Sequence, residues 1–283
     1  MRRIAEFMEL PAQRFDTGVA MVNHMSAMRV FPPDLTVYPL FAKAIHAEVL
    51  LEAGDMLYIP RRWWHWVTSY DRNIALSIWH AADRRSMSLP LDADDLSQID
   101  AVTDSCHFTS HYFGMKEPVL LRTDHIRRWP AFTKWTDDYL RAVIGGKRHH
   151  VGISPDPHLQ VIEGDHRTRA EVMSFNEFLD RSLTFSEYHY FGQDEVAPGL
   201  LQGDWSIPDF WSNCFTDNEF HPALWFTFGR EEGITSSLHF DHYENLLAQV
   251  TGRKRVLLFS PAQTPYLYRA KADFISLTPE VAK

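Results

Sequence analysis

The chain has 283 residues, of which 45% are hydrophobic and 13% aromatic, and its formal net charge is −9. This length is sufficient for one large or two modest domains with a buried core, and the composition excludes an intrinsically disordered chain. The negative charge disfavours general binding to nucleic acid or to an anionic membrane, so we expect no DNA binding and no membrane association.

The cysteine content and the N-terminal sequence indicate the compartment. Cys106 and Cys214 are too few for a disulfide framework, which fits a reducing environment. The first residues, Met-Arg-Arg-Ile-Ala-Glu, lack the apolar core of a signal peptide, and no apolar run reaches membrane-spanning length. These features predict a soluble cytoplasmic protein.

Strand patterns dominate residues 34–80. Residues 48–52 lead into an Ala-Gly-Asp turn, residues 56–59 stop at a proline, and residues 74–79 follow an Asp-Arg-Asn turn. Residues 84–105 are acidic and polar, which indicates a solvated helix or a linker.

The second half of the chain mixes helices with strands. We expect a helix over 134–144 that two glycines end, and a capping-box sequence from Ser174 to Glu177 opens another helix. Expected strands cover residues 117–122, 224–228, 238–250 and 254–259. Short strands with few helices predict a mainly β (α+β) fold, a sandwich or barrel with helical decoration.

Residues 236–254 bring together side chains suited to a metal site. His239 and Asp241 are one residue apart, so on a strand they project from the same face and can share one ion, and Asn245 has the same parity. We expect a tight turn at 251–253, after which Lys254 begins the returning strand with its ammonium opposite the metal. This pairing suits a ligand that chelates at one end and carries a carboxylate at the other.

Simpler interpretations exist for these residues. With fifteen histidines in the chain, about one His-x-Asp pair is expected by chance, and His239 can instead be a strand histidine hydrogen-bonded to Asp241. His107 and His111, four apart, could bind zinc on a helix, but no further ligand pattern supports this and we expect a solvated pair.

The extended motif carries more information than the pair. Ser-x-x-His-x-Asp-x-x-x-Asn followed by Gly-x-Lys, over 236–254, resembles the core of the JmjC-type (cupin-like) iron(II)/2-oxoglutarate-dependent oxygenases, particularly the small protein hydroxylases. Residues 52–66, with Gly-Asp-x-Leu-x-Ile-Pro and Trp-Trp-His, look like the distal segment of that family. The resemblance implies a double-stranded β-helix, the jelly-roll or cupin barrel.

The resemblance also implies roles for individual residues. Two histidines and one carboxylate form the facial triad of non-haem iron(II) oxygenases, so the implied iron ligands are His239, Asp241 and His65. Taken alone, His65 is better explained as a residue packed among neighbouring tryptophans, but after Gly-Asp-x-Leu-x-Ile-Pro a strand-turn-strand arrangement carries it toward the barrel interior. The implied contacts to 2-oxoglutarate, which reacts together with O2, come from Lys254 and Ser236 at the distal carboxylate, Asn245 near the iron-bound end, and Ser77.

The motif halves stand in an unexpected order, because in the family the lone histidine follows the His-x-Asp pair. We therefore predict that residues 1–83 form the C-terminal half of a barrel, 84–115 an acidic linker and 116–283 the N-terminal half. Three accounts fit: a permuted single barrel, a fragment of a tandem protein, or two partial modules completed by exchange between chains, as in a swapped homodimer.

The function implied by the resemblance is hydroxylation, or demethylation, of a protein side chain or similar substrate. We accordingly expect a protein or peptide as the partner. The rival hypothesis is a non-catalytic jelly-roll binding or scaffold module, or a fragment of a tandem JmjC protein with an incomplete iron site.

Overall fold

The computed structural model describes residues 24–28, 32–81, 100–103, 105, 107–159, 168–184 and 186–270, and the backbone of 19–21 and 274–276. Its strands are β1 Val19–Met21, β2 Ala47–Leu51, β3 Met56–Ile59, β4 Trp64–His80, β5 Ala101–Val102, β6 Val119–Leu121, β7 Arg148–Ser154, β8 His158–Leu159, β9 Arg169–Ser174, β10 Tyr188–Asp194, β11 Phe220–Phe228, β12 Ile234–Ser236, β13 His239–Phe240, β14 Glu244–Phe259 and β15 Phe274–Ser276. The α-helices are α2 Ala131–Lys134, α3 Asp137–Ile144, α4 Phe175–Thr184, α5 Ala197–Leu200 and α6 Asp209–Ser212. Two 3₁₀-helices, η2 Pro39–Lys43 and η4 Pro261–Tyr266, and a π-helix, η3 Phe108–Phe113, complete the described elements.

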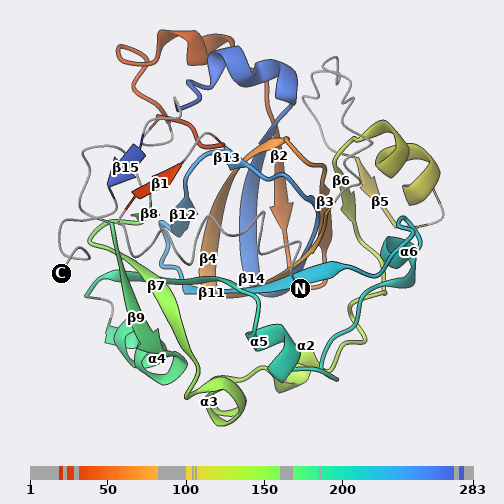
Figure 1. Ribbon diagram of the computed structural model, residues 1–283, viewed down its shortest axis with the longest axis vertical. Coiled ribbons are helices and arrows are strands. Elements are labelled where there is room, and N and C mark those ends of the chain that lie inside the picture. The colour runs from red at the N-terminus through yellow and green to blue at the C-terminus, as the bar shows by residue number, and fades with distance from the viewer. Residues whose placement is uncertain are drawn as a thin grey trace.

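Two long strands, β4 and β14, organise the fold (Figure 1). They pair antiparallel from Glu244 opposite His80 to Phe259 opposite Trp64. The main sheet has the order β5-β6-β3-β14-β4-β11-β10-β7-β9, while β2 pairs with β14 and β12 and β13 pair with β4. β1 and β15 form a separate two-stranded ladder. The result is the mainly β jelly-roll sandwich that the sequence predicted.

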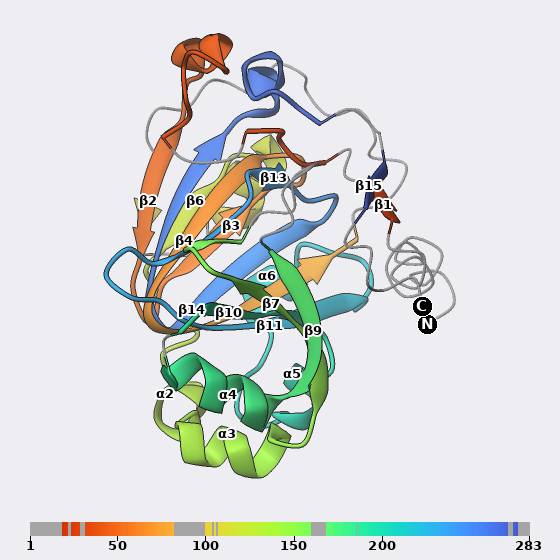
Figure 2. The same ribbon diagram turned by 90° about the vertical axis from the view of Figure 1, so that its left-hand side faces the viewer.

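Both long strands bend sharply and pass from one layer of the sandwich into the other (Figure 2). Asp71 and Gly252 adopt positive φ angles of 63° and 75° at the bend, and the β4–β14 register shifts between Gln249 and Arg253. The Asn73 side-chain amide donates hydrogen bonds to the carbonyls of Tyr70 and Arg253, at 3.1 and 2.8 Å, and so holds the two bends together.

The bend corrects three sequence-based expectations. Residues 251–253 do not return the chain, because β14 continues through them and stays paired with β4. The Asp-Arg-Asn segment at 71–73 is likewise a bend inside β4 rather than a turn between strands. The expected strand over 238–250 is interrupted after Phe240 and resumes at Glu244, which leaves Asp241 just outside β13.

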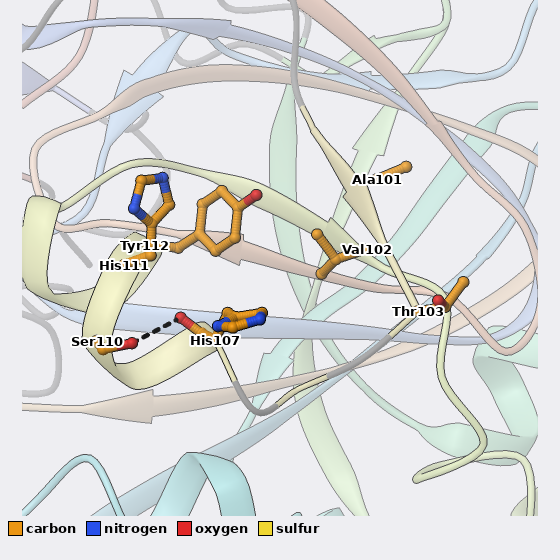
Figure 3. A pocket seen from close by; sticks show the side chains of 7 residues that line it. All are labelled: Ala101, Val102, Thr103, His107, Ser110, His111 and Tyr112. Atoms are coloured by element: carbon orange, nitrogen blue, oxygen red, sulfur yellow. Dashed lines mark hydrogen bonds between the residues drawn. The ribbon is translucent and has the colours of Figure 1, made fainter.

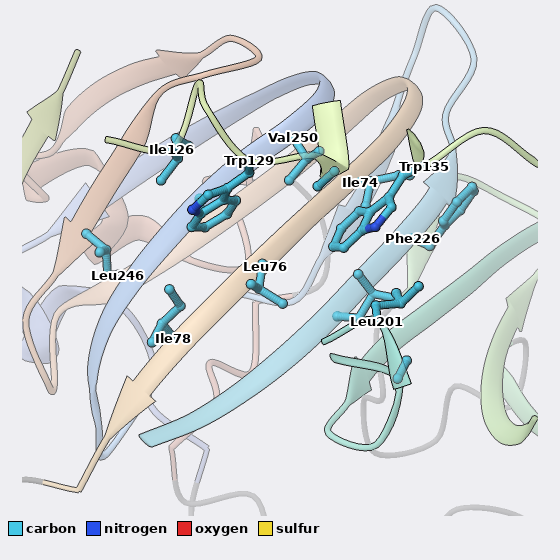
Figure 4. Close-up of a cluster of buried hydrophobic side chains, with 14 of the residues drawn as sticks. Ile74, Leu76, Ile78, Ile126, Trp129, Trp135, Leu201, Phe226, Leu246 and Val250 are labelled. Atoms are coloured by element: carbon cyan, nitrogen blue, oxygen red, sulfur yellow. The ribbon is translucent and has the colours of Figure 1, made fainter. Parts of the chain in front are cut away.

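One hydrophobic core lies between the main sheet and the helical layer (Figure 4). Apolar residues at alternate positions on β4, β11 and β14 face the helices, as the two-residue period of a strand requires. This core includes Ile74, Leu76, Ile78, Trp129, Trp135, Phe226, Leu246 and Val250. Because it is large and aromatic-rich, its burial supplies much of the stability that fixes the sheet.

A second core lies between the two layers of the sandwich. Its residues alternate along the strands with those of the first core, so their side chains point to the other face of the sheet. Leu57, Ile59, Ala75 and Leu247 of one layer meet Val49, Leu51, Val67, Val256 and Leu258 of the other. We call the strand surface turned toward this space the interior face. Side chains on the interior face therefore point into the barrel.

The helices agree in part with the sequence. The capping box of α4 is confirmed, since the Glu177 carboxylate accepts from the Ser174 backbone N–H at 2.7 Å and Ser174 Oγ accepts from the Glu177 N–H at 3.2 Å. The helix expected over 134–144 is wrong at its start. Thr136 is extended and accepts from the Tyr139 N–H with its side chain, so α3 begins at Asp137 and a separate short helix, α2, precedes it.

Strands from residues 47–80 and from 119–259 alternate in one sheet. Residues 82–99, which include half of the predicted acidic linker, lie outside the described part of the chain. The end of that segment is structured: β5 pairs with β6, and Phe108 of η3 is fully buried in the helix-side core. Among the described residues, no helix is long and apolar enough to cross a membrane.

The bend gives a stability prediction. A Cβ at position 252 would lie 2.5 Å from the Arg72 carbonyl oxygen, and φ there is positive. Gly252→Ala should therefore lower the free energy of unfolding by about 3 kcal/mol, the upper end expected for strained backbone, as measured by urea denaturation. Gly146→Ala, at a position with open space for a Cβ, is the control and should change stability by less than about 0.5 kcal/mol. Equal effects of the two variants would contradict the role assigned to the bend.

Candidate metal centre

His65 reaches the interior face through a tight connection between β3 and β4. β3 ends at Ile59, Arg62 adopts a positive φ of 67°, and β4 begins at Trp64. His65 then lies opposite Leu258 of β14, which belongs to the core between the layers. The histidine therefore points into the barrel, while its neighbours Trp64 and Trp66 pack in a separate cluster on the other face.

The His-x-Asp segment lies directly beside this histidine. In the β13–β4 ladder His239 is paired with His65, and their ring centroids are 4.2 Å apart. Asp241 follows β13, and its carbonyl accepts a hydrogen bond of 2.7 Å from the Arg62 N–H. Backbone contacts thus hold His65 beside His239 and Asp241, which are far from it in the sequence.

The side chains of His65, His239 and Asp241 converge. Their ligand atoms all lie within 4.8 Å of one another. Asp241 Oδ2 is 3.8 Å from His65 Nε2, and Asp241 Oδ1 is 4.0 Å from His239 Nε2. These separations are too long for hydrogen bonds, so the simple His239–Asp241 hydrogen bond is excluded, but they suit groups that share an ion with bonds of about 2.1 Å.

Hydrogen bonds at Nδ1 hold both imidazoles in an orientation that favours metal binding. His65 Nδ1 is 3.0 Å from the Trp63 carbonyl oxygen, and His239 Nδ1 is 2.7 Å from that of Ser237. Because a carbonyl only accepts, each Nδ1 carries a hydrogen, and each ring turns its Nε2 toward Asp241. This outer support is the arrangement seen for metal-bound histidines.

The electrostatics of the centre also keep His239 neutral. Burial, followed by the charge of His65, lowers the pKa of His239 to about 4, and Asp241 offsets only part of this effect. His239 is consequently unprotonated at neutral pH, as ligation requires. Its side chain keeps 24% of its surface accessible, against 5% for His65.

Lys254 lies deeper on the same interior face. It is paired with Ser69 in the β14–β4 ladder, four residues along β4 from His65, and is 2% exposed. Its Nζ donates to Ser69 Oγ at 2.5 Å. Burial lowers its pKa to about 7, and no carboxylate among the described residues pairs with it. Lys254 is therefore a buried cation-forming group that an anionic ligand would stabilise.

The other three sequence-predicted residues occupy different places. Asn245 faces the interior, opposite Trp79 and Ile59, and is buried with an unpartnered Oδ1. Ser77 also faces the interior, and its Oγ accepts from Trp225 Nε1 at 2.9 Å. Ser236 lies on β12, with its Oγ 3.5 Å from the Val67 carbonyl oxygen.

Some interior polar groups were not foreseen from the sequence. Ser69 lies on the same face of β4 as His65. The sequence would have predicted this position only if residues 64–80 had been expected to form one continuous strand. Buried side-chain atoms without a hydrogen-bond partner on the interior-facing positions of β4, β11 and β14 are Trp79 Nε1, His221 Nε2, Thr227 Oγ1, Asn245 Oδ1 and Gln249 Oε1. Such a concentration of unsatisfied groups is typical of a ligand-binding interior.

The histidine pair at 107 and 111 is not brought together with other ligands. Both belong to the π-helical region and line an open depression with Ala101, Val102, Thr103, Ser110 and Tyr112 (Figure 3). His111 is 59% exposed and 4.0 Å from the Glu117 carboxylate. In the described part of the chain, the groups that could hold a metal are confined to the His65 site.

The sequence profile of the cupin-like domain family matches residues 6–86 and 105–281, which is most of the chain. The chain belongs to the cupin-like (JmjC) domain family. The family predicted from the two motif halves is thereby confirmed. JmjC members are typically 2-oxoglutarate-dependent oxygenases that use iron(II).

Similar proteins bear names that indicate different activities. Lysine-specific demethylase 8 of Danio rerio is 31% identical over 62% of this chain and 42% of its own length. Jumonji C domain-containing protein 5 of Drosophila melanogaster is 29% identical over 66% of the chain and 47% of its own length. A tRNA wybutosine-synthesizing protein 5 of Homo sapiens is 28% identical over 62% and 60%. The cupin-like chain thus spans less than two thirds of each relative.

The buried lysine gives a pH prediction. Between pH 7 and 10.5 the unfolded chain binds a proton at residue 254 that the folded chain has lost, so this group makes the free energy of unfolding rise with pH. Lys254→Met should be more stable than wild type at pH 7, and the difference should shrink as the pH approaches 10.5. Denaturant unfolding of both proteins across this range, without added dicarboxylates, measures the difference. A difference that does not vary with pH would contradict the buried state of Lys254.

Proposed function

We propose that this chain is an iron(II)- and 2-oxoglutarate-dependent dioxygenase that hydroxylates or demethylates a protein side chain. The observation that carries the proposal is the convergence of His65, His239 and Asp241, with the buried Lys254 on the same interior face. In this proposal the three converging residues hold the iron.

Each interior residue has a defined task. The imidazoles of His65 and His239 present Nε2 as ligand atoms, and Asp241 supplies the carboxylate, which leaves coordination positions for other ligands. Lys254, about 13 Å along the strands from His65, pairs with the distal carboxylate of 2-oxoglutarate. Ser69 orients the Lys254 ammonium, and Ser236 adds a hydroxyl nearby.

The remaining polar residues serve the metal-bound end of the co-substrate. The unpartnered Asn245 Oδ1 and the Ser77 hydroxyl lie on the interior face, where a bound ligand can meet them. Iron(II), 2-oxoglutarate and O2 together supply an oxidant able to attack a C–H bond, and at an N-methyl carbon hydroxylation ends in loss of formaldehyde. The protein contributes positioning and the exclusion of water from the interior.

The choice of a protein substrate rests on charge and on the relatives. The names of two of the three relatives refer to lysine and to tRNA, respectively. The net charge of −9 disfavours a polyanion such as tRNA and is compatible with a peptide that carries positive charge.

We further propose that one chain closes the site. β13 pairs with β4 at the two histidines, and β14 pairs with β4 throughout, so the two motif halves share continuous backbone hydrogen bonding. Exchange between chains would have to form these same ladders between two molecules, and each half alone would expose unpaired strand edges.

Removal of a proposed ligand tests the metal site. His65→Ala, His239→Ala and Asp241→Ala should each weaken iron(II) binding at least about tenfold and abolish conversion of 2-oxoglutarate to succinate, because two ligands cannot hold the ion in place. Calorimetry under argon and succinate detection measure the two effects. His111→Ala, which removes an exposed histidine, is the matched control. Wild-type turnover in His65→Ala would overturn its assignment as a ligand.

Mixing inactive variants tests whether the site closes within one chain. Denatured His65→Ala and His239→Ala chains are mixed, refolded together and assayed for succinate. A site within one chain predicts no recovery, since every chain lacks one ligand. Recovery of about a quarter or more of wild-type activity would show instead that two chains exchange halves.

A further inference from the structure

A buried ion pair lies outside the metal centre, on the helix side of the sheet. Glu244, the first residue of β14, is fully buried, and its Oε1 is 3.0 Å from Lys116 Nζ. Its Oε2 accepts a hydrogen bond of 2.7 Å from the Tyr58 hydroxyl. A carboxylate removed from water in this way strongly destabilises a fold unless its partners stay in place. The position of Lys116 is therefore tied to the start of β14.

The backbone of Lys116 contacts the other segment that carries a proposed iron ligand. Its carbonyl oxygen accepts a hydrogen bond of 3.0 Å from Trp63 Nε1, in the connection between β3 and β4. The Trp63 carbonyl oxygen in turn lies 3.0 Å from His65 Nδ1. Trp63 is 2% exposed and packs in the core between the layers, which fixes its indole ring. Two hydrogen bonds thus lead from Lys116 to the imidazole of His65.

Glu244 connects the same lysine to the Asp241 segment. Residues 241–243 lie between β13 and β14 and belong to neither strand. One end of this segment is held by the Arg62 N–H, which bonds to the Asp241 carbonyl, and the other end is Glu244, paired with His80 in the β14–β4 ladder. The ion pair therefore anchors the end of the segment that leads away from the metal centre.

The backbone of Lys116 is strained. Its φ angle is 58°, in the left-handed region that side chains other than glycine rarely adopt. Such strain persists only where surrounding contacts hold the residue. Besides its bonds to Trp63 and Glu244, the ammonium lies 3.7 Å from the centroid of the Phe113 ring, and the side chain is only 20% exposed. Contacts at both ends of the residue thus fix it between the two segments.

Resting on the proposed function, we infer that Lys116 is a positioning residue for the metal centre: it holds the His65 connection through Trp63 and the start of β14 through Glu244. We call Lys116, Trp63, Glu244 and Tyr58 the Lys116 clamp. Groups outside the ligand set that orient the ligands raise the affinity of a site for its metal. The clamp thereby keeps the ligand atoms of two distant segments at a separation that suits one ion.

Metal binding by the full chain tests the clamp. Lys116→Met keeps the aliphatic stem against Phe113 but removes the charge, and Glu244→Gln keeps the shape of the side chain. Each should weaken iron(II) binding, measured by calorimetry under argon without 2-oxoglutarate, by about fivefold or more. At saturating iron(II), succinate formation by Glu244→Gln should return to at least roughly half the wild-type rate, because the clamp supplies no ligand. His65→Ala should stay inactive under the same conditions.

A second lysine provides the matched control. Lys134 Nζ is 2.8 Å from the buried carboxylate of Asp204, which also accepts from the Tyr139 hydroxyl. This pair belongs to the helical layer at α2, on the side of the sheet away from β13 (Figure 2). Lys134→Met removes an ion pair of the same composition and should leave the iron(II) affinity within about twofold of wild type. Thermal unfolding of every variant measures how far each is destabilised.

The double variant Lys116→Met/Glu244→Gln leaves no buried charge unpaired, so it carries the test even if Lys116→Met alone does not fold. Because the two residues act through one contact, the double variant should weaken iron(II) binding no more than roughly either single variant does.

The outcomes separate the two proposals. Wild-type iron(II) affinity in Glu244→Gln, an equal loss in Lys134→Met, or no recovery of Glu244→Gln at saturating iron(II) overturns the clamp even when the wild type forms succinate normally. A loss of affinity confined to the clamp variants, with no succinate formed by the wild type, overturns the dioxygenase and leaves the clamp standing. A wild-type chain that does not bind iron(II) overturns both.

Discussion

The antiparallel pairing of β4 with β14 is the interaction on which the rest of the structure depends. The two strands bend together near Asn73 and Gly252, so a single ladder supplies both layers of the sandwich. One consequence is that the interior face carries His65 in one layer and Trp79 in the other, on the same strand. β13 adds His239 to the edge of this ladder, and the metal centre follows from backbone hydrogen bonding.

The interior face of the barrel carries buried polar groups, whereas the core between the sheet and the helices is apolar. This difference indicates where a ligand binds. Among the described residues, the one side-chain partner of buried Lys254 is Ser69, and five buried polar atoms on interior-facing positions of β4, β11 and β14 have none. Unsatisfied groups of this kind destabilise a fold, so they persist where a ligand completes them. The aromatic core against α2, α3 and α4 compensates for this cost, because it fixes the outer side of the same strands.

Local signals in the sequence predicted local structure well. The capping box at Ser174 and the Gly-Asp turn before β3 depend on contacts within a few residues, and both are present. The errors came where tertiary contacts override such signals. The segment at 251–253 has turn-like residues, but the long ladder to β4 keeps it inside one strand. The helix start at Asp137 was missed because Thr136 acts as an N-cap.

The sequence by itself determined the family and the identity of the side chains, since the spacing of His239, Asp241, Asn245 and Lys254 is set by covalent geometry. It left open how His65, which precedes them, comes to the same place. Only the tertiary structure decided this, because strand pairing between residues 64–80 and 239–259 is a non-local interaction that no motif encodes.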